Sequence, residues 1–199
     1  MAVELSEVDR LILDRWAEVM GLLEAHRTLQ DRLDEQIQIV SDRVQRWARP
    51  LGFDVACSPR DSEIYAWRPS WYDKRKDLSR VELTVGGFSP IGFRKVDAPY
   101  PYVWVYTGNL EEFRVKEPER IALGQHFRAA LGDGAREWEA HDVDDSNGPL
   151  GRYLMSYDSA HRARLLARPE ALFTFCTEQF PVLFALADII DAELQKLAR

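Results

Sequence analysis

The chain has 199 residues, of which 46% are hydrophobic and 30% are charged. This composition is typical of a globular domain and excludes disordered and fibrous classes, and the length suits a single hydrophobic core. The formal net charge of −7 argues against sequence-independent nucleic-acid binding, because such binding depends on phosphate neutralisation by Lys and Arg.

The sequence predicts a cytoplasmic protein with no membrane association. No apolar run approaches the roughly 20 residues that cross a bilayer, and residues 1–7 lack the pattern of a secretory signal. Cys57 and Cys176 lie far apart in the sequence and outside any metal-binding or redox motif. We therefore expect two reduced thiols, with no disulfide and no cofactor.

A long helix is predicted for residues 1–49. From residue 8 to residue 47 apolar side chains recur every three or four positions, which is the period of a helix with a narrow apolar seam. Successive spacings of four at Leu29, Leu33 and Ile37 interrupt the heptad pattern, so any coiled coil is irregular. Two arrangements are compatible with the pattern, one continuous helix or a helical hairpin that turns near Thr28.

Residues 52–115 are predicted to form a β-meander, because short alternating runs are separated by Gly, Pro, Asp and Ser. Alternation is strict over residues 81–85, which indicates a strand with one buried face and one wetter face. The expected strands cover residues 53–57, 63–67, 81–88 and 102–106.

Residues 118–199 are predicted to be mixed and to end in helices. A helix is expected from Pro118 to about Leu131, and weaker strand patterns cover residues 137–143 and 151–155. From Ser159 onward the sequence is predicted to be helical. No repeat or linker divides the chain, so we expect one α+β domain over residues 1–199, with an antiparallel sheet of about four to six strands flanked by the terminal helices.

Sequence motifs for catalysis are missing. The best strand acid, Glu82, lacks the lysine that a PD-(D/E)XK nuclease requires two residues later. One acidic segment carries weak candidates for a metal site or an unfamiliar hydrolase, although a solvated turn between strands explains it more simply. These candidates are His141, Asp142, Asp144 and Asp145.

Aromatic and cationic residues are concentrated in the middle of the chain. Such residues are common at binding hot spots, and together they can stack bases and neutralise phosphates. An aromatic sheet core beside a solvated basic loop is the simpler explanation. The candidate binding residues are Trp67, Arg68, Trp71, Tyr72, Lys74, Arg75, Arg80 and Trp104.

The sequence therefore favours a non-enzymatic protein-interaction or assembly module that uses the long amphipathic helix and an aromatic-rich face of the sheet. The expected partner is another protein or a second copy that contacts the N-terminal helix, and the simplest assembly of copies is a two-fold homodimer. The alternative hypothesis is a nucleic-acid-binding or nucleic-acid-processing accessory protein that uses the aromatic and cationic residues.

Overall fold

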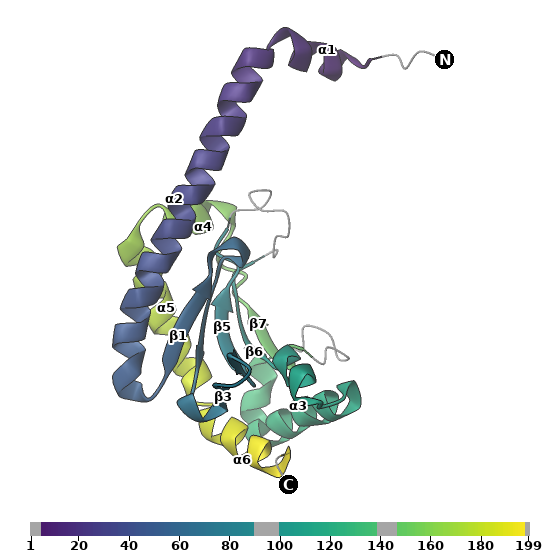
Figure 1. Cartoon of the computed structure of the whole chain (residues 1–199), viewed down its shortest axis with the longest axis vertical. Helices are drawn as coiled ribbons and strands as arrows, with labels where there is room; N and C mark the ends of the chain where they lie inside the picture. The colour runs from purple at the N-terminus through teal and green to yellow at the C-terminus, as the bar shows by residue number, and fades with distance from the viewer. Residues whose placement is uncertain (1–4, 90–99, 139–146, 198–199) are drawn as a thin grey trace.

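The computed structural model describes residues 5–89, 100–138 and 147–197, and it shows an α+β architecture (Figure 1). Its main sheet has five antiparallel strands in the order β1-β2-β5-β6-β7. Helices α2 and α5 pack against one face of this sheet. The predicted fold class, an antiparallel sheet flanked by an N-terminal helix and C-terminal helices, is confirmed.

The N-terminal region is helical, with a break at Arg15. Helix α1 (Glu7–Asp14) starts at a capping box formed by Ser6 and Asp9, and helix α2 covers Trp16–Ala48. Helix α2 has 33 residues, which corresponds to about 50 Å. It continues through Thr28, so the hairpin alternative is wrong. The break at Arg15 was not predicted, because no Gly or Pro marks it.

The strands agree closely with the predicted meander. All consecutive neighbours in the main sheet are antiparallel. The observed bounds are β1 Asp54–Ser58, β2 Glu63–Trp67, β5 Glu82–Gly86, β6 Tyr102–Tyr106 and β7 Leu150–Tyr153. Strand β7 corresponds to the expected strand at residues 151–155, whereas most of the one expected at residues 137–143 lies outside the described residues.

A small hairpin interrupts the meander between β2 and β5. Strands β3 (Tyr72–Asp73) and β4 (Leu78–Ser79) form a separate two-stranded sheet. The basic segment predicted as a solvated loop is the turn of this hairpin. Short 3₁₀ helices occur at Arg49–Leu51, Pro59–Asp61, Pro69–Trp71, Gly108–Phe113 and Gly132–Glu137.

The second half of the chain contributes four helices to the described structure. They are α3 Glu117–Leu131, α4 Ser159–Leu166, α5 Pro169–Phe184 and α6 Ala187–Leu197. Pro169 occupies the first residue of α5, where its missing N–H is harmless, and Pro181 lies inside the same helix. Among the described residues no single helix is long and apolar enough to cross a membrane, although α5 and α6 meet that criterion as a pair bent by 50°.

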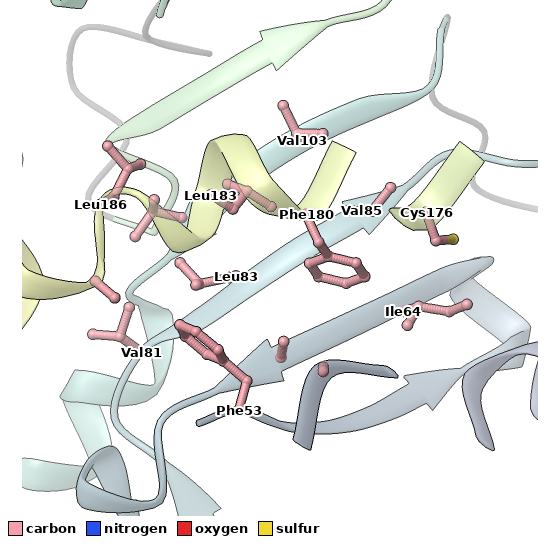
Figure 2. Packing of buried hydrophobic residues seen from close by; sticks show 14 of the residues in the cluster. Phe53, Ile64, Val81, Leu83, Val85, Val103, Cys176, Phe180, Leu183 and Leu186 are labelled. Carbon is pink, nitrogen blue, oxygen red and sulfur yellow. The ribbon is translucent and has the colours of Figure 1, made fainter. Parts of the chain in front are cut away.

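The hydrophobic core lies between the sheet and helices α2 and α5. Apolar residues at alternate strand positions point toward Phe180 and Leu183 of α5 (Figure 2). The C-terminal half of α2 adds Ile37, Val40 and Val44, each fully buried. This half of α2 also packs against α5.

Two glycines provide a matched test of the backbone. Gly52 ends the first helical region with φ of 89°, and Gly21 lies within α2; neither would crowd an added methyl group. We expect Gly52→Ala to lower the free energy of unfolding by about 1 kcal/mol, because L-residues disfavour left-handed backbone. Gly21→Ala should raise it by roughly 0.5–1 kcal/mol. Urea denaturation measures both; equal shifts of the same sign would contradict this account.

Candidate functional site

The sheet face opposite α2 and α5 is rich in aromatic side chains. Strand alternation points Tyr65 and Trp67 of β2 to the same side as three residues of β6. We call Tyr65, Trp67, Tyr102, Trp104 and Tyr106 the aromatic face. Neighbouring rings lie in contact, with centroids 5.8 Å apart for Tyr65 and Trp67 and 5.9 Å apart for Trp104 and Tyr106.

The central strand β5 places small or acidic residues between these rings. Thr84 is opposite both Tyr65 and Trp104, and Glu82 is opposite Tyr106. One aromatic strand therefore lies on each side of β5, about 5 Å away. The arrangement is a strip of small and acidic residues bordered by two rows of rings.

Two half-buried carboxylates belong to this face. Asn109 donates to Glu82 through a 2.9 Å bond between its Nδ2 and Oε1 of Glu82, and the Tyr102 hydroxyl donates to Glu63. Burial, with a smaller repulsion from Glu63, raises the pKa of Glu82 to about 7. Burial also raises the pKa of Glu63. These two acids were not predicted as site residues, although the alternation of residues 63–67 and 81–85 placed them on the same face as the rings.

Charges on the aromatic face are acidic. The five strands place no Lys or Arg on this side, and the charged residues there are Asp54, Glu63 and Glu82. Asp54 lies at the β1 edge, where the Gln45 amide donates to it. Within the described parts of the chain, neither Glu63 nor Glu82 has a cationic partner at ion-pair distance.

Two candidate binding residues from the sequence are structural. Trp71 is only 1% exposed, and its Nε1 donates to Oδ1 of Asp191 at 2.5 Å. Arg68 forms ion pairs with Asp188 and Asp191 of α6 and so ties the sheet to the C-terminal helix. The indole and the guanidinium thus stabilise the junction between sheet and helix, away from the aromatic face.

The remaining cationic candidates surround the small hairpin. Lys74 and Arg75 are exposed in its turn, and the Arg80 guanidinium lies 5.2 Å from the Phe113 ring centroid. Tyr72 connects the two groups: its ring stacks on Trp67, and its hydroxyl donates to Asp77. Of the eight candidate residues the structure brings Trp67 and Trp104 to the aromatic face, while the cations lie elsewhere.

No known protein family, curated protein or solved structure matches this chain.

Metal binding and nucleophilic catalysis find no support in the described residues. No group of three or more His, Cys, Asp or Glu side chains there is arranged to hold an ion. The candidates His141, Asp142, Asp144 and Asp145 lie outside the described residues. Cys176 is fully buried and Cys57 is half-buried, and burial raises the pKa of both thiols. A raised pKa disfavours the reactive thiolate.

A second feature of interest is the helical segment that extends away from the sheet (Figure 1). We call residues 7–29, which comprise α1 and the N-terminal part of α2, the projecting segment. Trp16 is 54% exposed, Leu22 is 72% exposed and Leu23 is 56% exposed. Val8, Leu11, Ile12, Leu13, Met20 and Leu29 are also exposed. A concentration of large exposed apolar side chains in one segment usually marks an interaction site.

Proposed function

We propose that the protein is an assembly module whose projecting segment pairs with that of a second copy. The observation that carries this proposal is the row of exposed apolar side chains on a helix that leaves the body. An isolated helix gains little stability in water, because most helical stability in proteins comes from packing an apolar face. A partner helix supplies that packing.

The apolar stripe of α2 supports an antiparallel arrangement. Counting back from the buried Ile37 in steps of three and four, the stripe continues through Leu33, Leu29, His26, Leu22 and Val19. The face that is buried on the body near the end of α2 is therefore exposed near its start. A parallel partner helix on this stripe would run into the body beyond Leu33.

In an antiparallel pair centred near residue 24, Arg15 of one copy meets Leu33 of the other. The paired length then ends at the break before α2 and at the point where α2 reaches the body. The two bodies lie at opposite ends of the pair, and α1 of each copy lies level with the body of the other. This pairing gives a closed two-fold dimer.

Charges beside the stripe favour the same arrangement. Glu18 and Arg32 are 14 residues apart, close to four helical turns, so they lie on the same flank of the stripe. Antiparallel pairing about residue 24 brings Glu18 of each copy within about one turn of Arg32 in the other copy. Exchange of these charges is a test of orientation: Glu18→Arg should weaken the dimer, and Glu18→Arg with Arg32→Glu should restore it.

Sedimentation equilibrium of the full chain tests this proposal directly. We expect a mass of twice the 23.0 kDa chain mass at micromolar concentration, with dissociation on dilution. Ionic strength should have a small effect, because the interface is mainly apolar. Micromolar affinity corresponds to a standard binding free energy of about 8 kcal/mol. A mass of one chain at all concentrations up to about 100 µM would contradict the proposal.

The nucleic-acid alternative has less support. Single-strand binding requires stacking rings beside phosphate-neutralising cations. On the aromatic face the rings accompany Glu63 and Glu82, which would repel phosphate. Arg68, the cationic candidate next in sequence to Trp67, is held by Asp188 and Asp191.

A further inference from the structure

A pocket of about 150 Å³ opens between the small hairpin, the 3₁₀ helix Gly108–Phe113 and α6. Five of its six lining residues are apolar, and the sixth is an arginine. Leu110 and Leu194 are only 1% and 7% exposed, so they form its inner wall. An apolar cavity of this volume accommodates a group about the size of one benzene ring. The lining residues are Arg80, Leu110, Phe113, Val115, Leu194 and Leu197.

Arg80 is the charged member of this lining. Its side chain is half-buried, and its guanidinium lies 5.2 Å from the Phe113 ring centroid. Within the parts of the chain that the structure describes, no carboxylate lies at ion-pair distance from this guanidinium. The acids of α6 are each bound by another cation, Asp188 and Asp191 by Arg68 and Glu193 by Lys196. The charge of Arg80 is therefore available to an anion in the pocket.

The hairpin turn is fixed to the 3₁₀ helix beside the pocket. Oδ1 of Asp73 accepts from the backbone N–H groups of Arg75 and Lys76, at 2.8 and 3.3 Å, which holds the shape of the turn. The Lys76 ammonium donates to the carbonyl of Glu112 and lies 5.1 Å from the Phe113 ring centroid. A second positive charge is thus held at the same ring as Arg80.

A tight reversal at the end of the 3₁₀ helix places two further lining residues. Arg114 has a φ of 64°, and its N–H donates to the carbonyl of Glu111 at 2.9 Å. The N–H of Val115 donates to the carbonyl of Leu110 at 3.1 Å. Phe113 and Val115 lie on either side of this reversal, so backbone hydrogen bonds shape this wall before a ligand binds. Such preorganisation lowers the entropic cost of binding.

We propose that this pocket binds a small free monocarboxylate whose apolar part is about the size of one aromatic ring. The planar guanidinium of Arg80 matches a carboxylate through two parallel hydrogen bonds. The leucine and valine side chains remove the apolar part of the ligand from water, and Phe113 offers an aromatic contact. The ammonium of Lys76 favours the same anionic ligand and disfavours a cation.

Phenylacetate and its uncharged analogue phenylacetamide provide the direct test. The full chain, labelled with nitrogen-15, is titrated with each at constant ionic strength, and NMR shifts of backbone amides report binding. We expect phenylacetate to bind with a dissociation constant on the order of 1 mM, with the largest shifts at residues 110–115 and 194–197. Phenylacetamide and acetate should each bind at least tenfold more weakly, because one lacks the charge and the other lacks the ring. Equal binding of the acid and the amide, or no binding of phenylacetate at about 50 mM, would overturn the proposal.

Variants locate the binding site. Arg80→Gln should weaken phenylacetate binding at least tenfold, and Leu197→Gln, at the exposed end of α6, should weaken it severalfold. Arg75→Gln is the matched control, because it makes the same change at an exposed position of the same hairpin. Circular dichroism checks that all three variants fold. Unchanged affinity in Arg80→Gln and Leu197→Gln, or an equal loss in Arg75→Gln, would refute the assignment.

A short peptide that ends in phenylalanine tests a chain end as the occupant. Binding of this peptide more tightly than phenylacetate would overturn the assignment to a small molecule, whereas equal or weaker binding supports it. The pocket lies at the end of the body opposite the projecting segment (Figure 1). The variant with Leu22→Glu and Leu23→Glu should therefore bind phenylacetate with wild-type affinity, whether or not the proposed dimer exists.

Discussion

Replacement of both Leu22 and Leu23 by glutamate is expected to hold the protein as a folded monomer. In the antiparallel pair Leu22 lies on the stripe and Leu23 on its flank, both close to the two-fold axis, so the two copies together place four leucines at or beside the interface and the variant replaces them with four carboxylates. Burial of one leucine stabilises by roughly 1.5–3 kcal/mol, and four together correspond to more than a 10³-fold change in the dissociation constant. Sedimentation equilibrium measures this change.

We expect the monomeric double variant to fold normally. Leu22 and Leu23 are 72% and 56% exposed, so they contribute little to the core of one chain. Leu51→Glu with Met155→Glu is the matched control, because both residues are exposed on the body, at positions away from the stripe. If both double variants remain dimeric, or if both dissociate to the same extent, the stripe is not the dimer interface.

Stability should fall as the pH rises from 5 to 8, and Glu82→Gln should remove most of that fall. The pKa of Glu82 is about 7 in the folded chain and 4.5 when unperturbed, so the folded state binds more protons between these values. Stability therefore decreases with pH in this window, by roughly 1–3 kcal/mol after allowance for partial exposure. Glu63, whose pKa burial also raises, acts with the same sign.

The acids with a lowered pKa contribute little to the change in stability between pH 5 and 8. Hydrogen bonds and ion pairs lower the pKa of Glu170 and Glu193, so their contributions are lost only below about pH 4.5. Urea denaturation at several pH values gives the free energy of unfolding for the wild type, Glu82→Gln and the exposed control Glu24→Gln. Parallel pH profiles for all three would show that Glu82 is not the titrating group.

Local periodicity predicted most of the fold. The five-residue alternations placed β2 and β6 to the residue, because turn residues bound each run and no competing helical period is present. The hairpin of β3 and β4 was missed, since a two-residue strand carries no period. The break at Arg15 was missed for a related reason: Leu13-Asp14-Arg15-Trp16 contains no helix breaker.

The candidate site was predicted less well, because sequence proximity does not determine which face a side chain occupies. Trp67 and Arg68 are adjacent, yet the indole lies on the aromatic face while the guanidinium reaches Asp188 and Asp191. That ion pair spans about 120 residues and leaves no local pattern. From the sequence, Glu82 is only a strand acid that lacks the lysine of a nuclease motif. Its position beside the rings becomes apparent only from its pairing with Tyr106 in the sheet.

The continuity of α2 has a consequence for avidity. One unbroken helix contains both the stripe of the proposed dimer and the core residues Ile37, Val40 and Val44, so no flexible linker separates the two functions. The aromatic faces of two copies would then be held at a set distance. A partner that contacts both faces at that spacing would gain from a high effective concentration at the second face, whereas a partner with another spacing would contact one face only.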